Sequence, residues 1–599
     1  MNLSGGLIRK LIYAAVIAML LLPLYRLGQP LTNEGGGALA KLRTNYGLAE
    51  ANLGEIDPAS NSMRLATLGM RGVAATLLWK KSDDYKKLQE WDRLSATLDV
   101  IALLQPHFEK VWEHQAHNLS YNISVEFDDY HQRYNWVKKG TEFLMRGVRR
   151  NRRAPRLEWY TGWFFGQKIG VSDEKRQFRK LFSDDKDFHK VVSEQGINIE
   201  DREANGPYQK PDNWLVGRLW LKHAYALVDN EHVPLLRKNP LHFYQDASLW
   251  RTHHGVAIEE EGVLDERAAQ AWRQATEDWI AYGSRDIPTY DGYSIRLGDL
   301  EKFRGDSSEL NQQFSAMTEG LEEKLRNDKL AALSDEEELA LDTPIADRTQ
   351  KQALLAAKAD TKLIVSREDI IHALPEVQQL AAMQLLAELA VMETKTNKIN
   401  GYRNQTNFDY WYTRTLAEQE EQTLKARRLI FEAEQALDTA ALKPALAKYE
   451  EAFTIWRDIL DRYPIMVSDA SSDDLVASIK RYIRILDVDQ LPDDFPLKVF
   501  IEMKGEDSGS RISHEAYIKS RSEEMSTQKP AKDEPKDELK DAPKSEPTDS
   551  SLDAPKSEPT DAPKSEPTDS SLDAPKSELR DASTVEPKDA PKEEPKDAP

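Results

Sequence analysis

The feature that most limits the possible folds is a pair of apolar stripes at helical spacing late in the chain. The first stripe is formed by Ala426, Leu429, Ile430, Ala433 and Leu437, and the second by Leu446, Tyr449, Ala452, Phe453, Trp456, Leu460 and Tyr463. Spacings of three and four residues place such side chains on one face of an α-helix. Pro464 follows the second stripe and ends the helix, because proline lacks an N–H group and clashes with the preceding turn. The stripes therefore predict two antiparallel helices packed as a hairpin.

Similar stripes recur through the body of the chain, whereas the alternation typical of strands is almost absent. They occupy WDRLSATLDVIALLQPHF (residues 91–108), PRLEWYTGWFFGQ (155–167), DNWLVGRLWLKHAY (212–225) and residues 264–279. We therefore expect an all-α protein made of an irregular array of antiparallel helical hairpins. YSIRLGDLE near Tyr293 and PLKVFIE near Pro496 are the plausible strands, either isolated or paired with each other.

The late helix pair also resembles a known repeat. KYEEAFTIWRDILDRYP (Lys448–Pro464) is similar to the second helix of a tetratricopeptide repeat with its terminating proline, and residues 91–108 and 212–225 are similar to other parts of that repeat. The resemblance implies an α-solenoid-like array in which the first helix of each pair lines a concave, peptide-binding groove. Pro106 and Pro155 are 49 residues apart, whereas the repeat has a period of 34, so the expected array is irregular.

A second resemblance covers residues 64–300. LATLGMRGVAATLLWKKSDDY (Leu65–Tyr85) and HNLSYNISVEFDDYHQRYNWVKKG (His117–Gly140) resemble a group of uncharacterised membrane-anchored proteins of planctomycete bacteria. This resemblance implies a location in the bacterial envelope and implies no activity.

The N-terminus carries an apolar run flanked by basic residues. Arg9 and Lys10 precede the run, whose core of about 15 residues spans about 22 Å, less than the roughly 30 Å hydrocarbon layer of a bilayer. One interpretation is an uncleaved signal-anchor helix over residues 11–28, with residues 1–10 in the cytoplasm and the body outside it. The alternatives are a cleaved signal peptide, which would make the protein secreted, and a buried soluble helix.

The remaining boundaries follow from composition. We expect a flexible stalk over residues 29–40, a tetratricopeptide-like domain over 41–299, long helices that could include a coiled-coil arm over 300–423, a second tetratricopeptide-like hairpin with a cap over 424–505, and a disordered tail over 506–599. Ser366 and Asp369 have the spacing of a capping box. Residues 531–599 contain 20 acidic and 11 basic residues and repeat APKSEPTD, so they have too few apolar groups to offset the entropy of ordering.

Composition and missing motifs exclude several function classes. The formal charge of -21 argues against nucleic-acid binding, and the absence of cysteine excludes disulfides and thiolate chemistry. We find no phosphate-binding glycine loop, no nucleophile elbow and no dinucleotide fingerprint, and so expect no catalytic residues and no cofactor. His117, Asp128, Asp129 and His131 could supply metal ligands, but they lack a metal-site spacing and we expect no metal.

One polar pattern stands out as a candidate site. His114, Asn118, Asn122 and Glu126 are spaced by four after Pro106, which places them on one face of the predicted helix. The resemblance to tetratricopeptide repeats implies Asn118 and Asn122 as groove residues that hold a peptide backbone or a carboxylate. The alternative is a solvated face or an internal network that joins neighbouring hairpins.

These observations predict a membrane-anchored, extracytoplasmic scaffold that binds a protein or peptide and performs no catalysis. The alternative is a carbohydrate-binding or carbohydrate-active envelope protein, suggested by the concentration of aromatic residues between Trp79 and Trp279. Most tryptophans lie in helical stripes, which favours core packing over sugar stacking. A purely structural envelope protein is a third option.

Overall fold

The computed structural model of the chain describes residues 71–527, apart from 237, 469–470, 487–490, 493 and 505–512, together with isolated positions between 13 and 42. The chain divides into the units Met1–Lys529 and Pro530–Pro599, and only the first contains described residues. Residues 1–10, most of the expected membrane segment 11–28, most of the stalk and the expected tail 506–599 apart from 513–527 therefore lie outside the described residues. Within that tail, residues His514–Thr527 form a helix, so this part of it is not disordered as expected. In the described part, none of the helices combines the length and the apolar content needed to cross a membrane.

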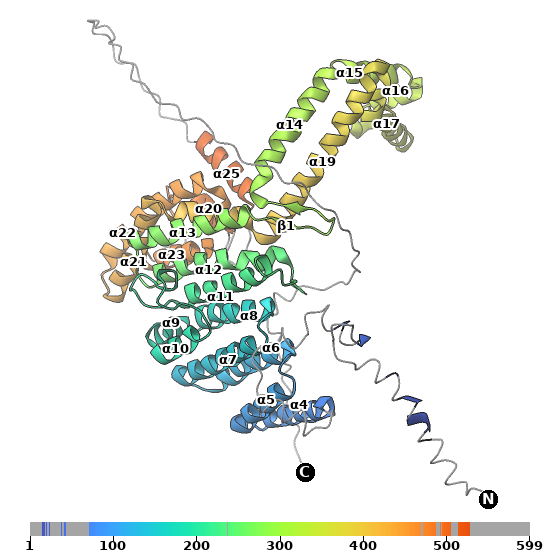
Figure 1. Ribbon diagram of the computed structural model, residues 1–599. Helices are drawn as coiled ribbons and strands as arrows, with labels where there is room; N and C mark the ends of the chain where they lie inside the picture. Colours follow the sequence, from blue (N-terminus) through green and yellow to red (C-terminus); the bar gives the residue numbers. More distant parts are fainter. Residues whose placement is uncertain are drawn as a thin grey trace, which may run out of the picture. The chain divides into compact units, whose positions relative to one another are not determined.

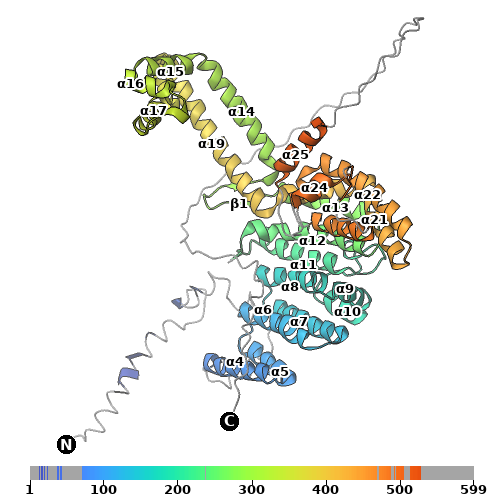
Figure 2. The ribbon, with the colours of Figure 1, turned by 180° about the vertical axis from the view of Figure 1, so that it is seen from behind.

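The described residues are almost entirely helical, which confirms the predicted all-α class (Figure 1). The first group of helices contains α4 (Arg71–Lys87), α5 (Trp91–Leu104), α6 (Glu109–His117), α7 (Tyr130–Arg150), α8 (Pro155–Phe164), α9 (Lys175–Asp184), α10 (Lys186–Ser193), α11 (Asn213–Asp229), α12 (Pro240–Glu260) and α13 (Glu266–Gly283). Successive helices pack against one another: α4 on α5, α6 on α7, α8 on α11, α11 on α12, and α12 on α13. Figure 2 shows the same succession of helices from behind.

Local sequence explains where these helices begin. Pro155 occupies the first turn of α8, where a missing N–H group costs nothing because it would have no partner in the helix. Asp212 caps α11, since its carboxylate accepts hydrogen bonds from the backbone N–H groups of Trp214 and Leu215. Asp129 caps α7 in the same way through the N–H of His131.

Helices α8 and α11 approach each other at two glycines. A Cβ atom added to Gly162 would lie 2.6 Å from the carbonyl oxygen of Gly217, and one added to Gly217 would lie 2.8 Å from the carbonyl oxygen of Gly162. The indole Nε1 of Trp250, on α12, donates to the Gly162 oxygen at 3.0 Å. Helices α8, α11 and α12 are therefore held together at one point that has no room for a side chain.

The segment 300–406 is an insertion between two helices that contact each other. Its helices are α14 (Leu300–Met317), α15 (Leu321–Ala331), α16 (Asp335–Asp342), α17 (Gln350–Leu363), α18 (Arg367–Ala373) and α19 (Glu376–Thr406). Helix α14 packs along α19, and α20 (Phe408–Glu418), which follows α19, packs on α13. The expected capping box at Ser366 and Asp369 begins α18.

The predicted late hairpin is present. Helices α21 (Glu421–Asp438) and α22 (Leu442–Arg462) pack against each other and are followed by α23 (Ser471–Leu486), α24 (Lys498–Lys504) and α25 (His514–Thr527). The apolar stripes read from the sequence face one core, where Tyr449, Phe453 and Ile459 are fully buried. The prediction of a helix pair ending at Pro464 is confirmed.

The strand predictions were only partly right. A two-residue strand β1 (Ile287–Pro288) pairs antiparallel with β2 (Ser294–Ile295), so the segment near Tyr293 does contain a strand. The prediction for PLKVFIE was wrong, because this segment forms α24. Leu497 and Phe500 are three residues apart and both buried, a spacing that suits a helix rather than a strand.

Candidate functional site

The four residues singled out by their spacing do not share one surface. His114 lies on α6 and is exposed, whereas Asn118 is buried and Asn122 half-buried. The reason lies in the backbone, because α6 ends at His117 and residues Asn118–Ile123 form a π-helical turn, η2. A π-turn holds more residues than an α-turn, so a spacing of four no longer repeats the same direction.

Three of the four residues have partners within the chain. Nδ2 of Asn122 donates to Oδ1 of Asn118 at 2.9 Å, and Oε2 of Glu126 accepts from Nε2 of Gln89 at 3.2 Å. The imidazole of His114 packs edge-on against the Trp79 ring, with centroids 5.4 Å apart. The amides of Asn118 and Asn122 thus bind each other, whereas His114 and Glu126 are exposed.

A second π-turn occurs on the neighbouring helix. Residues Phe165–Ile169 form η4, which continues α8, and η2 continues α6. π-Turns inside helices are uncommon and occur frequently at functional sites. The two π-turns continue α6 and α8, and these helices contact each other. The side chains between α6 and α8 are therefore candidates for a functional site.

Those side chains form a row of partly exposed rings, which we call the aromatic row. It consists of Trp79 from α4, His114 and His117 from α6, Tyr121 from η2, and Trp163 and Tyr160 from α8.

Ring stacking holds this row together. His117 stacks on Tyr121 with centroids 4.4 Å apart, and Tyr121 stacks on Trp163 at 6.3 Å. Trp163 and Tyr160 lie 5.5 Å apart with their planes within 2° of parallel. Aromatic pairs of this kind gain stability beyond their buried area, so the row is a preorganised surface rather than a set of mobile side chains.

A buried cation adjoins the row. Lys168, on η4, is only 8% exposed, and its Nζ lies 4.5 Å from the centre of the Tyr121 ring. Glu174 attracts it from a distance but is itself paired with Arg133, and no carboxylate of the described residues forms an ion pair with Lys168. Burial lowers the pKa of Lys168 below its ordinary value, because removal from water penalises the ammonium form.

The surrounding groups make the row electropositive or neutral. Burial lowers the pKa of His117, and the nearby charges of His114, Lys168 and Lys86 lower it further. Burial raises the pKa of Tyr160 to about 12, so its hydroxyl stays protonated in the physiological range. The row therefore offers hydrogen-bond donors and a cation beside flat apolar rings.

Sequence reasoning missed this arrangement for an identifiable reason. Most tryptophans lie in helical stripes and pack in the core, with Trp220, Trp272 and Trp279 fully buried. Trp163 and Tyr160 belong to the same stripe pattern, yet they are only half-buried. Periodicity places residues on a face of a helix, but it does not say whether another helix covers that face.

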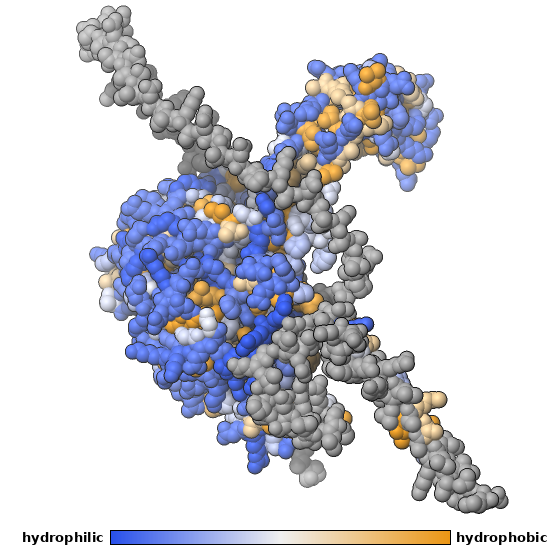
Figure 3. All heavy atoms as spheres, in the orientation of Figure 1, coloured by the Kyte–Doolittle hydropathy of each residue, from blue (hydrophilic) through white to orange (hydrophobic). Residues whose placement is uncertain are grey.

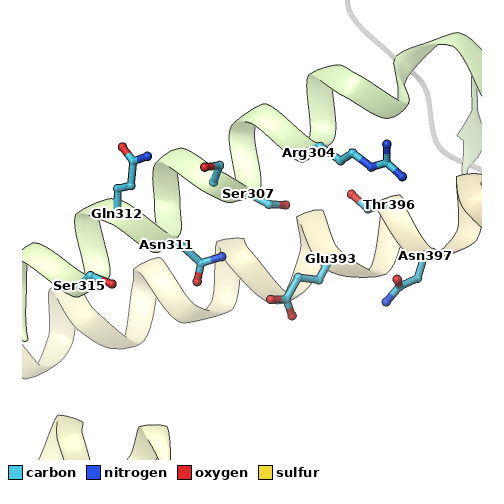
Figure 4. Close-up of a pocket in the computed structure, with 9 residues that line it drawn as sticks. Arg304, Ser307, Asn311, Gln312, Ser315, Glu393, Thr396 and Asn397 are labelled. Atoms are coloured by element: carbon cyan, nitrogen blue, oxygen red, sulfur yellow. The ribbon is translucent and has the colours of Figure 1, made fainter. Parts of the chain in front are cut away.

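One hollow lies in the insertion, between α14 and α19. It has a volume of about 790 Å³ and is lined by Arg304, Ser307, Ser308, Asn311, Gln312, Ser315, Glu393, Thr396 and Asn397 (Figure 4). It is a wide, polar gap between two helices. Figure 3 shows apolar surface on the same insertion, where Ile345 and Val377 are more than four-fifths exposed.

Several other polar groups of the interior form ion-pair networks between helices. Arg218 pairs with Asp278 and Glu203, and Arg179 pairs with Asp212 and Glu261. These bonds join α9 and α11 to α12, α13 and the segments beside them. Each of these buried charged groups has an oppositely charged partner, so the networks are explained by their role in joining helices.

The residues considered as metal ligands do not converge. His131 bonds to Asp129 at 3.1 Å, and both side chains are exposed. Within the described ranges, no three side chains of the metal-binding types gather at one point.

Comparison with known proteins adds no further constraint, because no protein-family model, no curated protein and no solved structure matches this chain.

Proposed function

We propose that this protein is a helical-repeat scaffold that binds an extended segment of another protein, with the aromatic row and Lys168 as its binding surface. The observation that carries the proposal is Lys168, a largely buried residue that lies against the Tyr121 ring and forms no ion pair with a described carboxylate. We further propose that the hairpins are arranged as in tetratricopeptide repeats and that the protein has no catalytic role.

The physical argument begins with the cost of Lys168. Removing a charge from water is unfavourable, so a largely buried lysine without a carboxylate partner destabilises the folded protein. Such local penalties concentrate at functional sites, where the missing partner is supplied by a ligand. A carboxylate on the bound segment would complete the ion pair in a setting where water screens it weakly.

The rings supply the rest of the contact. Tyr and Trp side chains bury a large area and lose little conformational freedom on binding. Because Tyr121, Trp163 and Tyr160 are already stacked, a ligand need not order them. An extended segment with apolar side chains and an acidic residue matches both the rings and the cation.

A carbohydrate ligand is the second candidate, since sugars also stack on tryptophan and tyrosine rings. The lysine side chains beside the row, Lys168 and Lys86, favour an anion over a neutral sugar. A sugar would instead call for amide and carboxylate partners around the rings, and the amides of Asn118 and Asn122 bind each other.

The proposal keeps the location expected from the sequence. An N-terminal signal anchor over residues 11–28 would hold the body outside the cytoplasm, where it would capture a partner in the envelope. Neither the anchor nor the partner is needed for the binding chemistry, so each is tested separately.

A displayed library of random twelve-residue peptides, selected on the full-length protein, tests the binding role. We expect enrichment of peptides that combine an acidic residue with proline, aliphatic or aromatic residues. Selection should fail on Lys168→Met and Trp163→Ala. It should succeed on Lys139→Met, because Lys139 also covers a tryptophan ring, that of Trp136, but lies outside the row.

Two outcomes would count against the proposal. If the selected peptides bind Lys168→Met as tightly as they bind the wild type, Lys168 is not part of the binding site. Enrichment of sugars on a glycan array, without any peptide enrichment, would favour the carbohydrate candidate instead.

A further inference from the structure

A second cavity lies away from the aromatic row, between the end of α12 and helices α21, α22 and α23. Its volume is about 500 Å³, within the range of pockets that hold small organic ligands. Apolar side chains form much of its wall, among them Ile430, Phe431, Trp456, Leu460 and Leu475.

Charged side chains among its lining residues form a tight cluster with two residues of α20. Nε of Arg427 donates to Oε2 of Glu418 at 2.6 Å and lies 3.2 Å from Oε2 of Glu259. Nε1 of Trp272 donates to the other oxygen of Glu259 at 2.7 Å. Arg414 also reaches Glu418, at 3.3 Å. Two glutamates and two arginines thus meet in a region where Glu418 is completely buried.

Two donors beside the cavity have hydrogen-bonding capacity that the described residues leave unused. The indole Nε1 of Trp456 is buried and has no hydrogen-bond partner among the described residues. The Arg427 guanidinium lies over the same ring, 5.2 Å from its centre, and uses Nε and Nη2 for Glu418. The N–H groups of Nη1 can therefore donate elsewhere. A buried donor without a partner costs about 1–3 kcal/mol, which a ligand acceptor would recover.

We propose that this cavity binds a small amphipathic carboxylate, whose apolar body lies among Phe431, Leu460 and Leu475 and whose carboxylate accepts hydrogen bonds from Arg427 and Trp456. The site is independent of the aromatic row, so each proposal can fail without the other.

The charge balance of the cluster favours an anion. Burial raises the pKa of Glu259 to about 8, despite the opposing effect of Arg427, and Glu418 raises it further. Arg427 lowers the pKa of Glu418, which stays ionised. Near neutral pH the cluster therefore contains two guanidinium groups and one carboxylate, and the ligand supplies the second negative charge. Four other acids line the cavity. Asp474, which also faces Arg427, and Asp438 are exposed and screened by water, whereas Glu260 pairs with Lys175 and Glu434 with Arg481.

The pH dependence follows from the same groups. As the pH rises through about 8, Glu259 ionises and competes with the ligand for Arg427. Affinity for the carboxylate should therefore fall above that pH. In Glu259→Gln the fall should be absent, because the amide does not ionise.

The test uses the full-length protein and the fluorescent carboxylate 11-(dansylamino)undecanoate as the probe. Competition with decanoate, decylamine and decanol compares an anion, a cation and a neutral alcohol on the same apolar body. We expect decanoate to displace the probe at about tenfold lower concentration than either of the other two.

A blocking variant locates the site. Ala477 lines the cavity from an exposed position on α23, so Ala477→Phe narrows it without replacing a core residue. The matched control is Ala447→Phe, at an exposed position on α22 outside the lining. We expect Ala477→Phe to weaken probe binding about tenfold or more and the control to stay within about twofold.

Several results would overturn the inference. The inference fails if the probe does not bind, or if decylamine and decanol displace the probe as well as decanoate does. Equal binding by Ala477→Phe and Ala447→Phe would place the probe elsewhere, for example on the apolar surface of the insertion.

Discussion

The contact between α8 and α11 gives the sharpest prediction about the fold. In Gly162→Ala, the new Cβ atom would lie 2.6 Å from the carbonyl oxygen of Gly217, 3.0 Å from Cβ of Trp220 and 3.1 Å from Cγ of Leu221. The oxygen belongs to a helix backbone and cannot rotate away, so the two helices must separate. Separation also stretches the hydrogen bond from Trp250 Nε1 to the Gly162 oxygen, now 3.0 Å.

The magnitude follows from two opposing terms. Overpacking of a closely packed interior costs about 1–3 kcal/mol, whereas alanine is favoured over glycine within a helix by up to about 1 kcal/mol. We therefore expect Gly162→Ala to lower the free energy of unfolding by about 1–2 kcal/mol. The assay is urea unfolding followed by tryptophan fluorescence, which reports Trp220 and Trp250 beside the contact.

Gly305→Ala is the matched control. Gly305 lies within α14, and a Cβ atom there would meet nothing within 4 Å. Only the gain in helix propensity applies, so stability should rise by up to about 1 kcal/mol. The packing argument is refuted if the two variants unfold at the same urea concentration, or if Gly305→Ala is the less stable one.

Three further predictions concern buried charges and the N-terminus. Lys168→Met should raise the free energy of unfolding, measured in urea, by about 1 kcal/mol. The substitution removes a largely buried charge and loses only the contact with the Tyr121 ring. A loss of stability would contradict this prediction. Relative to Glu259→Gln, the wild type should lose stability as the pH rises from about 4.5 to about 8. The pKa of Glu259 is higher in the folded protein than in the unfolded chain, so the unfolded chain releases this proton first. A stability difference that does not depend on pH would count against the raised pKa. If residues 11–28 form an uncleaved anchor, the mature protein should retain Met1 in intact-mass measurement and stay in the membrane pellet after carbonate extraction; a new N-terminus after residue 28 would establish cleavage.

Much of the fold could be predicted because it depends on periodicity. The stripes ending at Pro464 and the helix beginning at Pro155 follow from spacing and from the missing N–H of proline. PLKVFIE was mistaken for a strand because a short apolar run has no clear period, and packing on neighbouring helices decided its structure.

The binding surface could not be predicted in the same way. The prediction that His114, Asn118 and Glu126 share one face assumed an uninterrupted α-helix. Residue propensities do not predict the π-turn that begins at Asn118. Lys168 was not singled out from the sequence, because its burial depends on contacts between η2 and η4 in three dimensions. Among the residues proposed from sequence, His114 is the one that adjoins the row.

The most direct test of the central claim is the affinity of one selected acidic peptide for the full-length protein, measured by isothermal titration calorimetry. Wild type and Lys139→Met should bind alike, and Lys168→Met should bind at least about tenfold more weakly. Replacing the acidic residue of the peptide by its amide should weaken binding to the wild type but not to Lys168→Met. Equal loss in both proteins, or no loss with Lys168→Met, would contradict the pairing of Lys168 with a ligand carboxylate.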